Sequence, residues 1–293
     1  MKTALFSRKQ SGGVFSIEDQ TLSTGDRWFV DSNTGTDGAG YGQNPDKPVA
    51  TLDYAIGLAT TNKGDIIFVM PGHTETLTSK VDVDKADINI IGLGNGNHRP
   101  QFTVNANIDG IDVGAANVRI TNLYFNEGTN ANTSRINIGA AFCIIEDCHF
   151  DCGANDLESI TIEDEGDDCT IRSCTWRVTA DGPDAAIEIE HADTVRLIIE
   201  DCFFDGGSDA NGWDVGAINS GVAHTLCLIR RNVSLYGPGI IFSAGATGII
   251  ALNILGEGTL ASMLDPGSCM CFENYEADAV DQSARLIPTV VAS

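Results

Sequence analysis

The chain has 293 residues, which is long enough for two ordinary domains or for one extended architecture with a continuous core. Its 41 acidic residues against 17 basic ones give a formal net charge of -24, and no lysine follows Lys85. Such a surface repels phosphate backbones and anionic lipid headgroups, so the composition disfavours nucleic-acid binding and attachment to a membrane surface.

Residues 1–26 are interpreted as an arm that precedes the folded body. The segment contains Lys2, Arg8, Lys9 and a flexible Ser-Gly-Gly sequence, but no apolar core of signal-peptide length. We therefore expect the protein to fold in a reducing cytoplasm without secretion. A basic arm on an acidic body is suited to docking on a partner, and a disordered terminus is the alternative.

Residues 27–75 are expected to hold an N-terminal strand, a capping helix and a first coil. A region rich in glycine, asparagine, aspartate and proline leads into a helix at about residues 51–60. Thr51 is a suitable N-cap, and Leu52, Ala55 and Ile56 form an apolar stripe. A helix laid across the open end of a stacked-strand structure covers edge strands that would otherwise pair with other chains.

Residues 76–280 contain an internal repeat in which apolar and polar residues alternate around a small polar residue or glycine. The central residues recur at intervals of 21 to 31 and are Gly92, Asn122, Asp147, Ser173, Asp201, Asn232, Asn253 and Asn274. The residues that follow them are Leu93, Leu123, Cys148, Cys174, Cys202, Val233, Ile254 and Tyr275. Alternation with a period of two predicts a short strand, a polar bend and another short strand in each repeat.

A second type of strand recurs between these segments. Ile160 and Ile162 alternate with polar residues, and Ile187 and Ile189 repeat the pattern one unit later. Units of two or three short strands cannot bury their apolar faces alone and must stack on their neighbours. We therefore predict an all-β protein, a right-handed parallel β-helix (solenoid) over residues 76–280, with an N-terminal arm and a short capping helix.

The aligned repeats also make local predictions. Asparagine tolerates the left-handed backbone and can bond to the next coil, so Asn122, Asn232, Asn253 and Asn274 are expected to form a ladder at the bend. Arg230 falls in an inward column otherwise made of isoleucine, which predicts a β-bulge or register shift there. Residues 281–293 are interpreted as an apolar C-terminal tail that closes the far end or pairs between subunits.

Cys143, Cys148 and Cys152 lie within ten residues, a density also found in metal sites and disulfide frameworks. No gap between them matches the CxxC spacing of zinc ribbons. In the aligned repeat Cys148 belongs to the inward column, Cys143 stacks with Val118 and Cys169, and Cys152 falls in the loop beyond. We expect free, buried thiols that act as small hydrophobic side chains.

Three segments suggest a family. They are "WFVDSNTGTDGAGYGQNPDKPVATLDYAIGLA", "GDIIFVMPGHTETL" and "INIIGLGNGNHRPQF". Together they resemble the entry module of the pectate-lyase-like β-helix superfamily and, more narrowly, β-helix proteins encoded beside the capsid genes of tailed bacteriophages and prophages. The resemblance covers about residues 25–130. It implies a virion structural protein, decorating the capsid or belonging to a fibre or spike, and commonly trimeric.

The superfamily includes polysaccharide lyases and hydrolases, which raises the question of catalytic residues. A lyase needs a base over a calcium-neutralised uronate, but the coils after Lys85 contain no lysine. Glu163 and Glu190 align one coil apart as a candidate hydrolase pair, and a solvated acidic face is the favoured interpretation. His73 and His98 are expected to hydrogen-bond locally. We assign no catalytic, cofactor-binding or metal-binding residue and no cofactor.

The predicted function is that of a non-enzymatic virion structural protein of a tailed bacteriophage, made in the host cytoplasm. The first hypothesis is a capsid decoration protein that binds the shell through its arm and one end of the β-helix. The expected partners are two further copies in a homotrimer and the major capsid protein or other virion subunits, with no nucleic acid and no membrane. The alternative is a tailspike or fibre module that binds or cleaves host surface polysaccharide.

Overall fold

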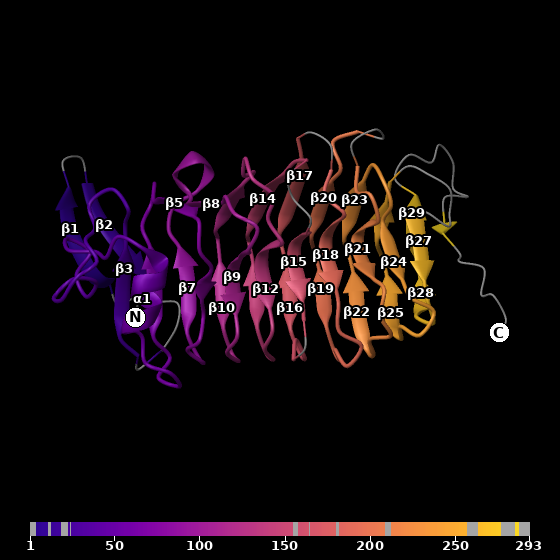
Figure 1. The fold of residues 1–293 in the computed structure, drawn as a ribbon, viewed down its shortest axis with the longest axis horizontal. Helices are drawn as coiled ribbons and strands as arrows, with labels where there is room; N and C mark the ends of the chain where they lie inside the picture. The colour runs from indigo at the N-terminus through magenta and orange to yellow at the C-terminus, as the bar shows by residue number, and fades with distance from the viewer. Residues whose placement is uncertain are drawn as a thin grey trace.

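Most of the chain winds into a right-handed parallel β-helix whose coils stack along one axis (Figure 1), which confirms the predicted fold class. The computed structural model describes residues 4–10, 13–18, 23, 25–154, 158–163, 165–179, 182–208, 212–256, 263–276 and 285–286. Residues 4–10, 13–18 and 285–286 are described by their backbone alone. Each full coil contributes one strand to each of three sheets, which surround a common core.

Within each sheet the strands lie side by side in chain order. Sheet 1 contains β3 (Arg27–Val30), β4 (Ile66–Val69), β7 (Asn89–Gly92), β10 (Arg119–Thr121), β13 (Ile144–Glu146), β16 (Thr170–Arg172), β19 (Ile198–Glu200), β22 (Cys227–Arg230), β25 (Gly248–Ala251) and β28 (Met270–Phe272). Sheet 2 contains β5 (Thr74–Leu77), β8 (Gln101–Val104), β11 (Tyr124–Asn126), β14 (His149–Cys152), β17 (Thr175–Val178), β20 (Phe203–Asp205), β23 (Val233–Leu235), β26 (Ile254–Leu255), β29 (Asn274–Glu276) and β30 (Arg285–Leu286). Sheet 3 contains β6 (Val81–Asp82), β9 (Asp109–Val113), β12 (Ser134–Ile138), β15 (Glu158–Ile162), β18 (Ala185–Ile189), β21 (Gly216–Ser220), β24 (Ile240–Phe242) and β27 (Leu264–Pro266).

The core consists of side-chain columns that run along the axis. Sheet 2 supplies a ladder of rings in which neighbouring centroids lie 6.0, 5.0, 4.9 and 4.5 Å apart. Its members are Phe102, Phe125, Phe150, Trp176 and Phe204, all of them buried. Burying one such side chain contributes about 1.5–3 kcal/mol. The period-two alternation found in the sequence is therefore the pattern that fills the core.

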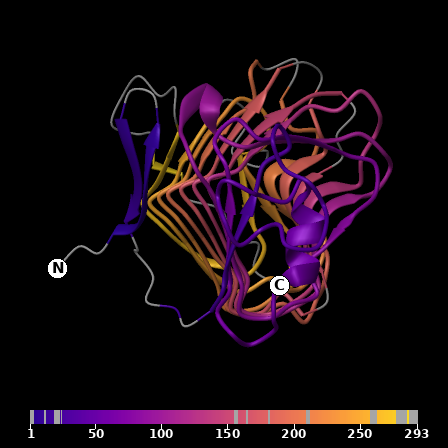
Figure 2. The same ribbon diagram turned by 90° about the vertical axis from the view of Figure 1, so that its left-hand side faces the viewer.

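The N-terminal end is covered as predicted. Helix α1 (Leu52–Leu58) begins at the N-cap Thr51, whose hydroxyl accepts a hydrogen bond from the Tyr54 amide. The helix buries Leu52 and Ile56 beside β3, β4 and β6, and Figure 2 shows it at the near end of the solenoid. The expected arm contains an antiparallel hairpin of β1 (Ala4–Gln10) and β2 (Gly13–Glu18), which lies to one side in Figure 2.

The predicted bulge at Arg230 is wrong, because the alignment slipped by one residue. Arg230 pairs in register with Glu200, and its Nε donates to Glu200 Oε2 at 2.7 Å on the outer face of sheet 1. The inward residues of that strand are Cys227 and Ile229. Arg231 and Asn232 are adjacent and both polar, so either could be aligned as the central residue of the repeat. The bend residue with positive φ is Arg231.

The same slip changes the roles of three asparagines. Asn122 takes the predicted left-handed conformation, with φ of 61°. Asn232, Asn253 and Asn274 lie one position later, at the inward positions that cysteines occupy in earlier coils, and all three are buried. They do form the expected ladder: the Asn232 and Asn253 amides donate to the side-chain oxygen of the next asparagine at 3.1 and 2.9 Å.

The cysteines behave as small core residues. All nine are free thiols, and seven are buried. Cys148, Cys174 and Cys202 share one inward column, and Cys143 stacks with Cys169, as predicted. Cys152 was expected in a loop, but it is the last residue of β14 and is fully buried. Its strand continues two residues past the ring ladder, which returns its side chain to the core.

Candidate functional site

An open groove of about 280 Å³ lies on the outer face of sheet 2, near the N-terminal end of the solenoid. We call it the Tyr124 groove. It is lined by Gly96, Asn97, Arg99, Gln101, Tyr124, Asn126 and His149. Strands β8, β11 and β14 supply four of these residues, and the connection containing the 3-10 helix η1 (Gly96–His98) supplies the others.

The register of the strands determines which side chains lie together on the floor of the groove. Gln101, Tyr124 and His149 occupy one outward row on three neighbouring strands, opposite the inward ring ladder. Parallel strands repeat about every 4.8 Å, a spacing that lets flat rings on adjacent coils stack. The Tyr124 and His149 rings accordingly stack with centroids 4.7 Å apart and planes inclined by 27°.

Asp151 holds both rings in place. The Tyr124 hydroxyl donates to Asp151 Oδ2, and His149 Nε2 lies 3.3 Å from Asp151 Oδ1. Burial, together with this hydrogen bond, raises the pKa of Tyr124 well above its ordinary value. Burial also opposes ionisation of Asp151, but hydrogen bonds from His149 and Tyr124 outweigh it and lower the pKa of that carboxyl. Near neutral pH the phenol is therefore a neutral donor held by a carboxylate.

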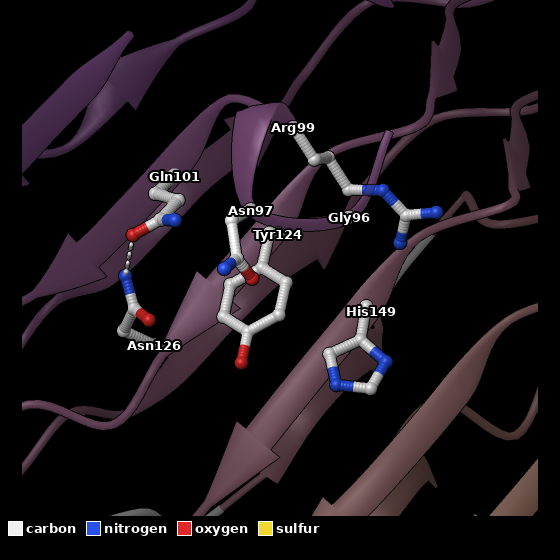
Figure 3. A pocket seen from close by; sticks show the side chains of 7 residues that line it. All are labelled: Gly96, Asn97, Arg99, Gln101, Tyr124, Asn126 and His149. Atoms are coloured by element: carbon white, nitrogen blue, oxygen red, sulfur yellow. Dashed lines mark hydrogen bonds between the residues drawn. The ribbon is translucent and has the colours of Figure 1, made fainter. Parts of the chain in front are cut away.

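The connection before β8 forms the wall of the groove. Gly94 has φ of 97°, and a Cβ there would meet the His98 carbonyl oxygen at 2.6 Å, so the tight turn needs glycine. The turn places Arg99 beside the Tyr124 ring (Figure 3). Within the described residues Arg99 has no ion pair, and its buried Nε has no hydrogen-bond partner.

Amide groups line the opposite side of the groove. Asn126 Nδ2 donates to Gln101 Oε1 at 3.3 Å, and Figure 3 shows this pair across Tyr124 from Arg99 and His149. That bond leaves the Gln101 amide nitrogen and both ends of the exposed Asn97 side chain to other partners. The groove thus combines stacked rings, amides and one guanidinium, a set that binds polar ligands containing flat apolar faces and an anionic group.

The carboxylates singled out in the sequence lie elsewhere. Glu163 and Glu190 follow β15 and β18 on sheet 3 and align one coil apart, as predicted. The pKa of Glu190 is raised mainly by burial and to a smaller extent by repulsion from the Glu163 carboxylate. Nearby, burial and then the carboxylate of Glu190 raise the pKa of Glu158 to about 8. Among the described residues no group of three or more histidine, cysteine or acidic side chains could hold a metal ion.

The groove was missed in the sequence, although a signal for it was present. Tyr124 and His149 each precede an inward phenylalanine in the aligned segments, which already places them outward and one coil apart. His73 behaves as predicted: its Nδ1 accepts from the Ser32 amide at 3.0 Å, and its Nε2 lies 3.1 Å from Glu75.

No protein-family model and no curated protein matches the chain. Among solved structures, a rhamnogalacturonan lyase is similar with a TM-score of 0.49 and 14% identity, over 85% of this chain and 87% of that one. The pectate lyase Pel9A gives a TM-score of 0.47 and 13% identity, over 87% and 75%. A lacto-N-biosidase from Eubacterium ramulus gives 0.40 and 12%, over 86% and 67%.

These similarities concern the fold alone. The parallel β-helix itself is established by the order of the strands in the three sheets. Membership of the pectate-lyase-like superfamily and the bacteriophage origin stay predictions. Among the described residues, no helix has both the length and the apolar character needed to cross a membrane.

Proposed function

We propose that this protein is a saccharide-binding β-helix that takes an acidic sugar of a surface polysaccharide into the Tyr124 groove. The observation that supports it best is the Arg99 guanidinium, which has no ion pair among the described residues and lies beside the stacked Tyr124 and His149 rings. Rings suit the apolar faces of a pyranose, and amides suit its hydroxyl groups. A guanidinium suits a carboxylate or sulfate, which it can bind through two parallel hydrogen bonds.

The proposed role is binding without cleavage. Glycoside hydrolysis uses two carboxyl groups that flank the scissile bond, and none of the seven lining residues has one. The Asp151 carboxylate is engaged by the Tyr124 hydroxyl and His149 Nε2, and these contacts keep it ionised. Glu163 and Glu190 lie on sheet 3, whereas the groove lies on sheet 2.

For the biological setting we propose a tailspike or fibre of a tailed bacteriophage, with the groove facing host polysaccharide. This setting rests on the resemblance of about residues 25–130, and a homotrimer in the virion is part of the same proposal. The capsid-decoration hypothesis depends on the arm at residues 1–26 and on one end of the β-helix, and the side chains of residues 1–22 lie outside the described part of the chain. It stays a prediction, and the groove favours the alternative.

The test is direct binding to polysaccharides. Acidic and neutral bacterial polysaccharides are arrayed and probed with the full chain, and the strongest ligand is then titrated by calorimetry. Losing one charge-assisted pair costs about 1.5–3 kcal/mol, so Arg99→Gln should weaken binding about tenfold or more. Tyr124→Ala should weaken it comparably by removing the ring.

Two matched controls make the same substitutions at positions away from the groove. Tyr275 occupies the same outward row of sheet 2 at the last coil, and Arg196 is exposed and paired with Asp168. Tyr275→Ala and Arg196→Gln should leave affinity unchanged. Equal loss in a groove variant and its control would contradict the proposed site, and release of shorter saccharides by the wild type would contradict the non-enzymatic role.

A further inference from the structure

The arginines in the coils at 76–280 differ in whether they have an acidic partner. Five form ion pairs with carboxylates of sheet 1 or of the bends beside it: Arg119, Arg172, Arg196, Arg230 and Arg231. Arg135 is buried inside the solenoid, where it has hydrogen-bond partners. For the two others, Arg99 and Arg177, the described residues supply no ion pair. In a chain with 41 acidic residues, these two guanidinium groups are open to an anionic ligand.

Arg177 has carboxylates on both sides but binds neither. It lies on the outer face of sheet 2, in register with Asp151 on one neighbouring strand and Asp205 on the other. In the same relation on sheet 1, Arg172 Nε donates to Glu146 Oε2 at 2.7 Å. Asp151 instead holds the two rings of the Tyr124 groove, and Asp205 Oδ1 accepts from a backbone amide of its own loop at 3.0 Å. The exposed side chain of Arg177 is therefore left without a carboxylate among the described residues.

Arg99 and Arg177 lie on opposite sides of the stacked rings. Arg99 comes from the connection before β8, where the chain enters sheet 2. Arg177 lies in the second outward row of the sheet, two positions along the strand from the row of Tyr124 and His149. Its charge reaches the groove: burial opposes ionisation of Asp151, and the hydrogen bonds from the rings, followed by the charges of His149 and Arg177, lower the pKa of that carboxyl. A ligand over the rings is therefore flanked by two guanidinium groups.

An exposed aromatic ring accompanies Arg177. Phe203 belongs to the first outward row, two coils beyond His149, and Thr175 lies between them in that row. The Phe203 side chain is 38% exposed, so part of its ring is open to a ligand. Two coil spacings amount to about 10 Å, and one sugar ring resting on Tyr124 and His149 does not reach Phe203. Guanidinium, hydroxyl and ring thus repeat the chemistry of the Tyr124 groove farther along the axis.

We propose that Arg177, Thr175 and Phe203 form a second saccharide subsite, and that the ligand is an oligosaccharide with at least two acidic sugars lying along sheet 2. The proposal rests on the proposed function of the Tyr124 groove and names its ligand more closely. The Arg177 guanidinium binds the anionic group of the second acidic sugar through two parallel hydrogen bonds. The exposed part of Phe203 contacts an apolar face of that sugar, and the Thr175 hydroxyl bonds to its hydroxyl groups.

Calorimetric titration of the full chain with acidic sugars of two lengths tests the second subsite. The probes are single sugars and tetrasaccharides of galacturonate, mannuronate, glucuronate and 6-O-sulfated glucose. Arg177→Gln should weaken tetrasaccharide binding about tenfold or more, because one charge-assisted pair is lost. It should leave binding of the single sugar, which occupies the Tyr124 groove, within about twofold. Phe203→Ala should also weaken only the tetrasaccharide, whereas Arg99→Gln should weaken both probes.

Two controls separate binding from folding and from general charge. Arg196→Gln removes an exposed arginine beside sheet 1 and should leave both affinities unchanged. Arg177→Gln should unfold at the same temperature as the wild type, because it breaks no ion pair of the described residues.

The outcomes distinguish this inference from the proposed function. Tetrasaccharide binding that Arg99→Gln weakens and Arg177→Gln does not would overturn the second subsite and leave the proposed function standing. Equal losses for the single sugar and the tetrasaccharide in Arg177→Gln would place this arginine at the first sugar and would also overturn the second subsite. Tetrasaccharide binding that neither variant weakens, or no binding of any probe to the wild type, would overturn both.

Discussion

Replacing Asn253 with alanine tests the asparagine ladder. The Asn253 side chain is fully buried and makes four hydrogen bonds. Its Oδ1 accepts from the backbone and side-chain nitrogens of Asn232 at 3.0 and 3.1 Å. Its Nδ2 donates to the Ile229 carbonyl at 3.1 Å and to Asn274 Oδ1 at 2.9 Å. The substitution removes all four bonds and leaves a buried backbone N–H of Asn232 without that acceptor.

The magnitude follows from the number of bonds. At about 1 kcal/mol for each net hydrogen bond, the free energy of unfolding should fall by about 4 kcal/mol. Asn122→Ala is the matched control, because Asn122 is partly exposed and makes only two such bonds, to the carbonyls of Gly92 and Gly94. It should cost about 1–2 kcal/mol.

The assay is urea unfolding combined with hydrogen exchange, because stacked coils can unfold in parts. Asn253→Ala should lower protection most in β22, β25 and β28, the strands on either side of the ladder. A loss below about 1 kcal/mol, or a loss no larger than that of Asn122→Ala, would refute the view that this ladder holds the C-terminal coils together.

Three further predictions concern the core and the backbone. Burial lowers the pKa of His224 from 6.5 to about 4, so the folded state binds a proton there less readily than the unfolded state does. The free energy of unfolding should therefore be unaffected by this group above pH 6.5 and should fall by up to about 3 kcal/mol as the pH drops to 4. His224→Gln should flatten that part of the urea-midpoint profile against pH, and an unchanged slope would contradict the assignment. Gly248 has φ of 150°, and a Cβ there would meet the Cys227 carbonyl oxygen at 2.2 Å, so Gly248→Ala should destabilise by at least about 2 kcal/mol in thermal unfolding. Gly57→Ala is its control, because nothing lies within 4 Å of the added Cβ and a helix gains about 0.5–1 kcal/mol from the change. Trp176→Ala removes the ring between Phe150 and Phe204 and should cost about 3–5 kcal/mol in urea unfolding; a cost under about 1 kcal/mol would mean that the ring ladder contributes little.

The repeat predicted the fold well because alternation is a local property of the sequence. Inward isoleucines such as Ile160 and Ile187 mark the strands of sheet 3, and Thr51 marks the start of α1. Alternation alone does not determine which residue occupies a bend when two adjacent residues are polar. Arg231 and Asn232 are both polar, and only the three-dimensional pairing of Glu200 with Arg230 decides which of them is buried.

The groove could not be assigned from the motifs because its residues come from three coils. Arg99, Tyr124 and His149 are separated by 25 residues each, and none belongs to a recognisable catalytic motif. Alignment of the coils places Tyr124 beside His149. It does not show that the turn at Gly94 brings Arg99 to the same place without an acidic partner among the described residues.

The central claim is that Arg99 pairs with an acidic group of a saccharide held on the Tyr124 and His149 rings. The most direct measurement is a calorimetric double cycle, in which wild type and Arg99→Gln are each titrated with a carboxylated oligosaccharide and with its carboxyl-reduced neutral analogue. The account predicts that the wild type prefers the carboxylated ligand, that Arg99→Gln abolishes the preference, and that the coupling energy is about 1.5–3 kcal/mol. A coupling energy near zero, with both ligands bound equally by both proteins, would contradict it.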